Sequence, residues 1–195
     1  MSPRLVVSRL LSDTEIAPWV TPDEVAAAAG FAPMRRSEWL SWRAIVRREL
    51  VAATGCAVQE IRIAYDEVGA PVVENSPVHV AVSHCKGSVA VALSDAPCAV
   101  DIESLGRDFW RVASRYMTGA EAALCSDPRW PAVLWSAKEC LYKYAGRREL
   151  DLLRDLRVER VDLSAGTLVG RIGDGGAPLR LCFLFLAGRV VVYLS

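Results

Sequence analysis

Hydrophobic and polar residues alternate in several short segments of the chain, and a period of two predicts β-strands. Residues 5–11 form the first such segment and residues 58–65 the second, which a turn at 66–71 follows. Residues 78–82 and 89–93 form two more, with Lys86-Gly87 between them. A short connection that contains glycine favours antiparallel pairing, so these two segments predict a β-hairpin.

Other segments carry the period of a helix. Residues 35–53 are apolar at 39, 42, 46 and 50 with arginines between, which predicts an amphipathic helix with a strongly basic side, ended by Gly55. Residues 132–145 hold no proline or glycine, which predicts a helix of three to four turns. Thr21-Pro22-Asp23-Glu24 has the composition of a helix start, with threonine as N-cap and glutamate three residues later.

Two stretches of the chain are similar to each other. Residues 77–94 align without gaps on residues 178–195, a constant offset of 101 (178 − 77). An offset of 100 places R-R-E-L at 147–150, as a helix end, on R-R-E-L at 47–50. Because short strands also match by chance, the alternative is coincidence; we adopt a duplication. The predicted fold class is therefore α+β, a pseudo-dimer of two similar halves, each a long helix on a small antiparallel sheet. The predicted halves are residues 1–96 and 97–195.

Composition narrows the function classes. The chain has 195 residues, 52% of them hydrophobic, and a formal net charge of zero, which argues against binding nucleic acid through bulk charge. Its six cysteines lack C-x-x-C spacing and predict buried thiols in a reducing compartment. The start of the chain lacks the continuous apolar core of a signal peptide, and no run has the length of a membrane span. We expect a cytoplasmic protein with neither nucleic acid nor membrane as a partner.

Candidate chemistry lies in two acidic motifs. In W-S-A-K-E-C-L-Y-K at 135–143, Trp135, Glu139 and Lys143 are four residues apart and share one helix face. Taken alone, Glu139 and Lys143 are explained better by a solvated ion pair. The strand A-V-D-I-E at 99–103 adds Asp101 and Glu103 on one face, where they either reach water or bind a divalent cation.

These motifs also carry a family resemblance. R-R-S-E-W-L-S-W-R-A-I-V-R-R at 35–48, V-S-H-C at 82–85, A-V-D-I-E, and W-S-A-K-E-C-L-Y-K resemble, in order and spacing, 4′-phosphopantetheinyl transferases of the surfactin/enterobactin-synthetase type. M-T-G-A-E at 117–121 is a fifth, weaker match. The resemblance implies a monomeric pseudo-dimer that transfers the 4′-phosphopantetheine arm of coenzyme A to a serine of an apo acyl or peptidyl carrier protein and releases adenosine 3′,5′-bisphosphate.

The resemblance also implies roles for individual residues. Asp101, Glu103 and Glu139 match the positions that bind Mg²⁺, with Mn²⁺ as an alternative, and Lys143 matches a lysine near the reacting phosphate. Ser83 and His84 match contacts to coenzyme A, and Arg43 matches an arginine at its place. Arg36 and Arg47 are further candidates for phosphate contact, because a guanidinium fits phosphate oxygens; their alternative is a solvated basic helix face.

Attack of a serine on an anionic pyrophosphate requires charge neutralisation and a base. Glu139 is the first candidate for that base and Glu121 the second. His84 donates to a phosphate or serves as a structural hydrogen-bonding residue.

Two positions depart from the family pattern: Ala70 stands where a basic residue is usual, and Trp42 where glycine is usual. The alternatives to the transferase are a catalytically weak carrier-protein or coenzyme A binding module, and an unrelated metal-dependent phosphohydrolase.

Overall fold

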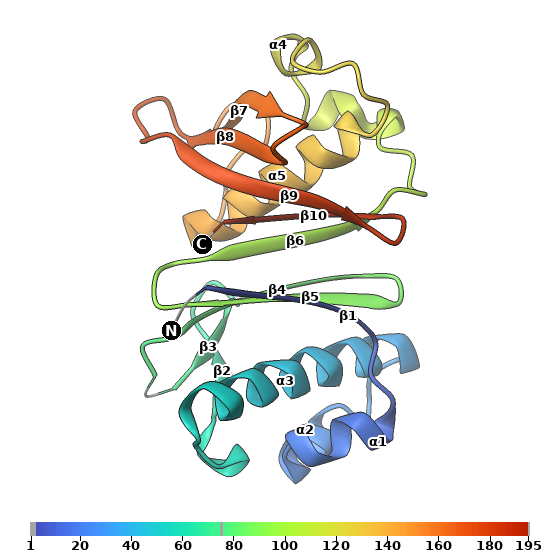
Figure 1. Cartoon of the computed structure of the whole chain (residues 1–195), viewed down its shortest axis with the longest axis vertical. Helices are drawn as coiled ribbons and strands as arrows, with labels where there is room; N and C mark the ends of the chain where they lie inside the picture. Colours follow the sequence, from blue (N-terminus) through green and yellow to red (C-terminus); the bar gives the residue numbers. More distant parts are fainter. Residues whose placement is uncertain (1–2, 75, 195) are drawn as a thin grey trace. The chain divides into compact units, whose positions relative to one another are not determined.

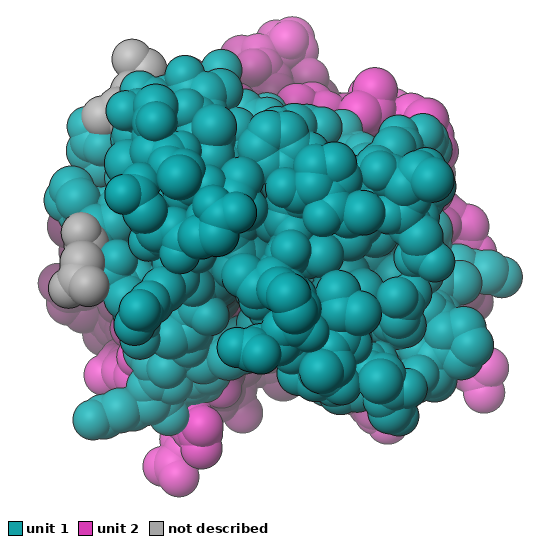
Figure 2. Space-filling view, turned by 90° about the horizontal axis from the view of Figure 1, so that it is seen from below, with its two compact units in different colours: residues 1–97 teal, residues 98–195 magenta. Residues whose placement is uncertain are grey.

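The computed structural model describes residues 3–74 and 76–194, and the chain divides into two compact units, residues 1–97 and 98–195. Figure 1 traces the secondary structure and Figure 2 colours the two units. Every helix in the described ranges is too short or too polar to span a lipid bilayer. The six cysteines are free thiols, but the prediction that they are buried holds only for Cys140, because Cys56 is exposed and the other four are partly exposed.

The first unit is one long helix with a five-stranded antiparallel sheet and shorter helices. Its elements are β1 (Arg4–Arg9), α1 (Asp13–Ile16), η1 (Ala17–Trp19), α2 (Pro22–Ala27), α3 (Pro33–Thr54), η2 (Val58–Glu60), β2 (Ile63–Tyr65), β3 (Pro71–Val73), β4 (His79–Cys85) and β5 (Ser88–Ser94). The strand order is β1-β5-β4-β3-β2. Thr21 caps α2 as predicted, and Gly55 ends α3 with a φ of 74°.

The second unit repeats this plan. Its elements are β6 (Ala99–Ser104), η3 (Trp110–Arg115), α4 (Gly119–Ala122), α5 (Trp130–Ala145), β7 (Leu156–Asp162), β8 (Thr167–Ile172), β9 (Leu179–Leu186) and β10 (Arg189–Leu194). The strand order β6-β10-β9-β8-β7 matches that of the first unit element for element. The α+β class with two similar halves is confirmed, since each unit is a long helix with an antiparallel sheet.

The predicted repeat corresponds to equivalent hairpins. In β4–β5 Cys85 pairs with Ser88, and in β9–β10 Leu186 pairs with Arg189, which preserves the offset of 101 (186 − 85). The last repeat position, Ser195, lies outside the described residues. Each sheet also contains a strand that precedes the long helix, β1 or β6, and pairs with the last strand of its unit.

Two local predictions were wrong. Residues 147–150 lie beyond α5, which ends at Ala145 with Gly146 in the left-handed conformation, so the second R-R-E-L is not helical. Residues 58–65 divide into η2 and the three-residue β2, because Glu60 accepts the Ala57 N–H and closes a turn. The alternative of a solvated basic face on α3 does not hold for Arg43 and Arg47, since each is only 2% exposed.

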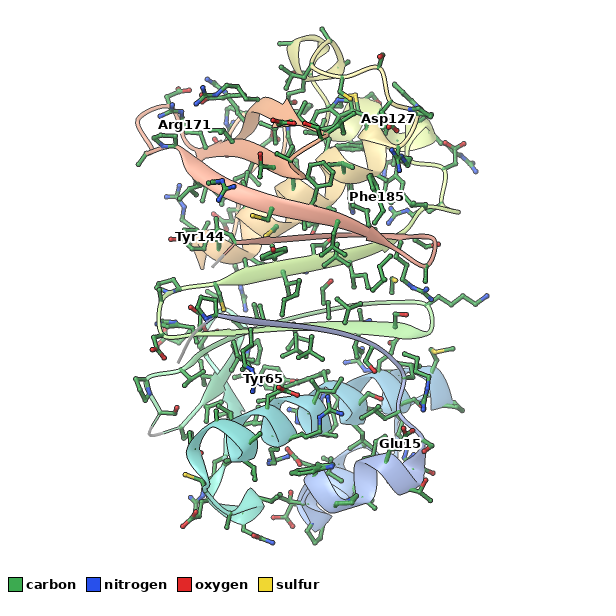
Figure 3. All side chains as sticks on the ribbon, in the orientation of Figure 1. Glu15, Tyr65, Asp127, Tyr144, Arg171 and Phe185 are labelled. Atoms are coloured by element: carbon green, nitrogen blue, oxygen red, sulfur yellow. The ribbon has the colours of Figure 1, made fainter. Side chains whose placement is uncertain are left out.

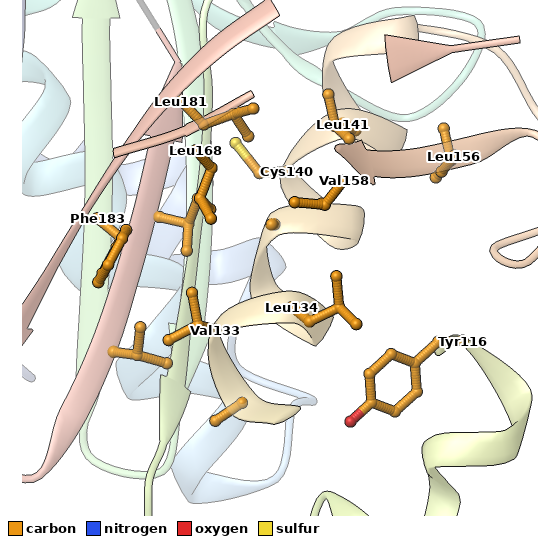
Figure 4. Packing of buried hydrophobic residues seen from close by; sticks show 14 of the residues in the cluster. Tyr116, Val133, Leu134, Cys140, Leu141, Leu156, Val158, Leu168, Leu181 and Phe183 are labelled. Atoms are coloured by element: carbon orange, nitrogen blue, oxygen red, sulfur yellow. The ribbon is translucent and has the colours of Figure 1, made fainter. Parts of the chain in front are cut away.

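The core of the second unit holds α5 against its sheet. Buried residues of α5 contact those of β7, β8 and β9, among them Leu134, Leu141, Val158, Leu168 and Leu181. Figure 4 shows these side chains meeting between helix and strands. Burial of this apolar surface fixes the rotation of α5, and that rotation decides which of its polar residues face β6.

Candidate functional site: an acidic group on β6 and α5

Strand β6 carries two carboxylates in the part that pairs with β10. Asp101 lies opposite Val192 and Glu103 opposite Val190, so both belong to the same face of the strand. Asp101 is only 4% exposed, whereas Glu103 is half-buried. A buried carboxylate requires donors or a cation, and α5 supplies them.

Asp101 is held by two side chains of α5. Ser136 Oγ donates to Asp101 Oδ2 at 2.7 Å, and Lys143 Nζ donates to Asp101 Oδ1 at 2.7 Å. Lys143 also donates to the Val100 carbonyl oxygen at 3.1 Å. Ser136 and Lys143 are two turns apart on α5, which places both above the strand. The Lys143 ammonium therefore neutralises the most buried of the acids.

Glu103 accepts two further donors. Trp135 Nε1 donates at 2.9 Å and Arg107 Nη1 at 3.0 Å, both to Oε1. The Arg107 guanidinium also lies 5.0 Å from the Trp135 ring centroid. Burial first, and then the neighbouring Asp101 charge, nevertheless raise the pKa of Glu103 above its ordinary value.

Glu139 completes what we call the acidic group, defined as Asp101, Glu103 and Glu139. Burial first, and then the Asp101 and Glu103 charges, raise the pKa of Glu139, while Lys143 opposes the shift. Asp101 and Glu103 accept side-chain hydrogen bonds, but within residues 3–74 and 76–194 no hydrogen bond reaches the Glu139 carboxylate, which leaves this acid the least engaged of the three.

The acidic group matches Mg²⁺ in ligand chemistry but not in its present arrangement. Three carboxylates are the hard oxygen donors that Mg²⁺ prefers, and their mutual repulsion favours a cation. Over the residues that the structure describes, however, no three His, Cys, Asp or Glu side chains are placed to hold a metal ion. The side chains of Asp101 and Glu103 are turned to protein donors instead.

Glu121, the second candidate for the base, lies in a different environment. It is 4% exposed and accepts hydrogen bonds from Lys138 Nζ at 2.8 Å, Val158 N at 3.0 Å and Thr118 N at 2.9 Å. Lys138 is fully buried and also donates to the Leu152 carbonyl oxygen at 2.7 Å. This buried ion pair joins α4, α5 and β7, which favours a structural role for Glu121.

The arginines predicted to bind phosphate lie in the first unit and are largely engaged. Arg47 donates to Glu24 Oε2 at 2.6 Å and to the Ile61 carbonyl oxygen at 3.0 Å, and Arg43 Nε donates to Glu24 Oε1 at 3.1 Å. Arg36 forms an exposed ion pair with Asp13 at 3.0 Å. The surroundings of Arg43 and Arg47 favour a structural role, because both guanidinium groups are buried beside one carboxylate.

Strand β4 carries the other predicted contacts. Ser83 is buried, whereas the His84 side chain is 52% exposed and its Nδ1 lies 3.3 Å from Glu38 Oε2. His84 also lines a pocket of about 370 Å³ within the first unit, which we call the α3 pocket. Its lining residues are Arg35, Glu38, Trp39, Trp42, Tyr65, Gly69, Pro71, Val82 and His84.

Sequence reasoning missed two parts of these sites. Arg35 and Tyr65 line the α3 pocket, but neither was predicted there, although Arg35 stood in the matched motif. Lys138 belongs to the W-S-A-K-E motif, but no role was predicted for it. Helical spacing gives the signal: Lys138 directly precedes Glu139, so its side chain lies on a different face of the helix.

Comparison with known families adds an independent finding. Residues 97–185 match the model of the 4′-phosphopantetheinyl transferase superfamily. This segment contains the whole acidic group, Lys143 and all of α5, and the match supports phosphopantetheine transfer as the reaction class. Comparison with curated proteins gave no match.

Proposed function

We propose that this chain is a monomeric, cytoplasmic 4′-phosphopantetheinyl transferase of the surfactin/enterobactin-synthetase type. It transfers the phosphopantetheine arm of coenzyme A, with Mg²⁺, to a serine of an apo acyl or peptidyl carrier protein, and adenosine 3′,5′-bisphosphate leaves. One observation carries the proposal: within the segment that matches the superfamily, Asp101, Glu103, Glu139 and Lys143 interact electrostatically across β6 and α5.

The acidic group and its neighbours Lys143 and Ser136 have different roles in the proposed reaction. Asp101, Glu103 and Glu139 would hold Mg²⁺ only in an arrangement other than the present one, and the ion would then offset negative charge on the pyrophosphate. Glu139 accepts the proton of the attacking serine hydroxyl, because Asp101 and Glu103 are already hydrogen-bonded to protein donors and Glu139 is the least engaged of the three. Lys143 offsets the negative charge that develops on the leaving phosphate, and Ser136 keeps Asp101 oriented.

We assign the adenosine part of coenzyme A to the α3 pocket. Its lining offers flat aromatic faces, a guanidinium at Arg35 and an imidazole at His84, which suit a base and its phosphates. Arg36 and Ser83 remain proposed contacts near it. Ala70 stands in the neighbouring turn where a basic residue is usual, so this turn lacks one cation. Phosphate binding therefore depends more on Arg35 and His84.

The test is an intact-mass assay of an apo carrier protein incubated with the chain, coenzyme A and Mg²⁺. The proposal expects the carrier to gain the mass of phosphopantetheine. Asp101→Ala and Glu139→Gln should each reduce the rate by a factor of about 100 or more while circular dichroism shows an intact fold. Glu159→Gln is the matched control, because that carboxylate pairs with Arg171 at the surface of β7 and β8. Full activity in both acidic-group variants would remove these residues from the mechanism.

The arrangement of Asp101 favours one alternative, a catalytically weak binding module. The Lys143 ammonium forms an ion pair with the Asp101 carboxylate, which Mg²⁺ would need as a ligand. A chain in which this ion pair persists would bind coenzyme A or carrier without transfer. The same assay separates the two functions, because binding of carrier at high protein concentration without any mass gain supports the module. Cleavage of coenzyme A with no carrier present would instead indicate a phosphohydrolase.

A further inference from the structure

Lys143 is a cation built into the acidic group. Its Nζ donates to Asp101 Oδ1 at 2.7 Å and to the Val100 carbonyl oxygen at 3.1 Å. Ser136 Oγ donates to the other oxygen, Asp101 Oδ2, at 2.7 Å. Each oxygen of this buried carboxylate therefore already accepts a hydrogen bond, one of them from a full positive charge. The ammonium neutralises Asp101 as a metal ion would, and two cations at one oxygen repel each other.

This contact explains why the acidic group is not arranged as a metal site. In the ranges 3–74 and 76–194, no three His, Cys, Asp or Glu side chains are placed to hold an ion. Asp101 faces Lys143, and Glu103 faces Trp135 and Arg107. A divalent cation can use Asp101 as a ligand only if the ammonium leaves it, because the buried carboxylate is otherwise already paired.

Lys143 is the partner of Asp101 that can leave without disturbing the core. Its side chain is 31% exposed, whereas Ser136 is fully buried. Lysine has a point charge on a flexible four-carbon stem, so the ammonium can turn toward solvent while the stem stays on the helix. Figure 3 labels Tyr144, which follows Lys143 in the last turn of α5. The end of the helix thus leaves room for this movement.

The partners of Glu103 are held more firmly. Trp135 Nε1 donates to Glu103, and the Trp135 ring packs edge to face against the buried Tyr116 ring with centroids 5.1 Å apart. The Arg107 guanidinium lies 4.8 Å from the Phe109 ring centroid. Release of Glu103 would unpack these aromatic contacts. An exchange of cations is therefore expected at Asp101 first.

We propose that Lys143 is an exchangeable internal cation, which pairs with Asp101 in the absence of a divalent cation and leaves it when one binds. The inference rests on the part of the proposed function that gives the acidic group a divalent cation. It makes Lys143 the residue that sets the metal affinity of this group. The released ammonium is then free to meet the phosphates of coenzyme A, which is the role that the proposed function gives to Lys143.

The first experiment observes the lysine ammonium groups of the wild-type chain by NMR. The sequence has three lysines, Lys86, Lys138 and Lys143, so ¹⁵N labelling of lysine alone gives few signals. An ammonium held in hydrogen bonds exchanges its protons slowly enough to be observed, whereas a solvated one loses its signal to exchange with water. Mg²⁺ should therefore abolish the Lys143 signal, which is identified by its absence from Lys143→Gln.

Two controls accompany this spectrum. Lys138 is the internal reference, because it is fully buried and donates to Glu121 and to the Leu152 carbonyl oxygen, so its signal should persist. NaCl at equal ionic strength controls for screening of the ion pair. A Lys143 signal that persists when Mg²⁺ is bound would overturn the proposal. Equal loss of the signal in NaCl would also overturn it, because screening alone would then break the pair.

The second experiment measures Mg²⁺ affinity by titration calorimetry. Lys143→Gln removes the competing ammonium and should bind Mg²⁺ about tenfold more tightly than the wild-type chain. Lys143→Arg is the matched control, because it keeps a cation that can pair with Asp101, and it should bind Mg²⁺ within about twofold of the wild-type affinity. Binding by Lys143→Gln alone would support the proposal, and equal affinity of Lys143→Gln and the wild-type chain would overturn it.

The outcomes separate this inference from the proposed function. If Lys143→Gln fails to fold, the wild-type spectrum decides alone. Transfer of phosphopantetheine by a chain whose Lys143 signal persists in Mg²⁺ would overturn this inference and leave the proposed function standing. Absence of Mg²⁺ binding to both the wild-type chain and a folded Lys143→Gln chain would overturn this inference and the metal part of the proposed function together.

Discussion

The three carboxylates of the acidic group differ in the side chains that surround them. Asp101 receives a lysine and a serine, Glu103 receives an arginine and an indole, and Glu139 interacts with Lys143 through charge alone. Burial first, and then the Asp101 and Glu103 charges, raise the pKa of Glu139 above 4.5, so the folded chain binds the Glu139 proton more tightly than the unfolded chain does. The acidic group thus carries a stability penalty at neutral pH.

The pH dependence of stability tests this penalty. For a carboxyl group with a raised folded-state pKa, the favourable contribution is complete below 4.5 and is lost as pH rises through the folded-state value. Glu139→Gln removes the ionisation and should raise Tm at pH 7 by roughly 2 °C. The difference should shrink at pH 4, where the wild-type carboxyl is protonated. Scanning calorimetry at both pH values is the measurement, and an equal gain at both would contradict the explanation.

The buried pair of Lys138 and Glu121 makes the opposite prediction. Lys138→Met leaves Glu121 buried without its cation and should reduce the free energy of unfolding by about 3–5 kcal/mol. Adding Glu121→Gln to that variant should restore part of the loss, because the uncompensated charge is gone. Urea denaturation of the two single variants and the double variant measures both effects. A Glu121→Gln chain of near-normal stability whose transfer rate falls by orders of magnitude would establish Glu121 as the base.

At the scale of elements, α5 is positioned by its close approach to β8. Gly170 permits that approach, because a Cβ there would meet Leu141 Cδ1 at 2.8 Å, Leu181 Cδ1 at 3.1 Å and the Arg157 carbonyl oxygen at 3.3 Å. The helix carries Ser136, Glu139 and Lys143, so its distance from the sheet also sets their distance from β6. Packing far from the acids therefore contributes to the site.

Gly170→Ala tests this dependence. The added methyl group overpacks the interface of α5 and β8 and should lower the free energy of unfolding by about 1–3 kcal/mol. Gly175→Ala is the matched control, because nothing lies within 4 Å of its Cβ, and it should change stability by less than about 0.5 kcal/mol. Urea denaturation compares the two. Equal effects would show that space at β8 does not limit the helix.

Element boundaries were predictable where a local signal exists. Gly55, Thr21 and the Lys86-Gly87 turn each mark an end or a cap by backbone preference, and the structure follows them. The second R-R-E-L failed because Gly146 ends α5 first. The same four-residue sequence, R-R-E-L, does not continue a helix when the residue before it adopts the left-handed conformation.

At the scale of the whole molecule, the two units share one topology but not one set of local solutions. The equivalent turns are Lys86-Gly87 and Ala187-Gly188, and both glycines have positive φ. Ala187 also has a positive φ, of 48°, which strains an alanine, whereas Lys86 is not in that region. The second hairpin thus has the same register as the first, although alanine is poorly suited to the positive φ at position 187.

Ala187→Gly should relieve this strain and raise the free energy of unfolding by about 0.5–1 kcal/mol. Lys86→Gly, at the equivalent position of the first hairpin, should give no gain, because glycine there only adds freedom to the unfolded chain. Thermal unfolding of both variants makes the comparison. A gain from Lys86→Gly equal to that from Ala187→Gly would refute the assignment of strain to Ala187.

The sequence by itself determined the α+β class, the equivalent hairpins, and the presence of Asp101, Glu103, Glu139 and Lys143 on elements whose periods are local. Tertiary structure alone decided which charges are buried together. Arg43 and Arg47 are 19 and 23 residues from Glu24, and Lys138 is 17 from Glu121. Periodicity places a side chain on a face, but the partner opposite that face is set by packing between distant elements, because only that packing excludes the water that would otherwise solvate each charge.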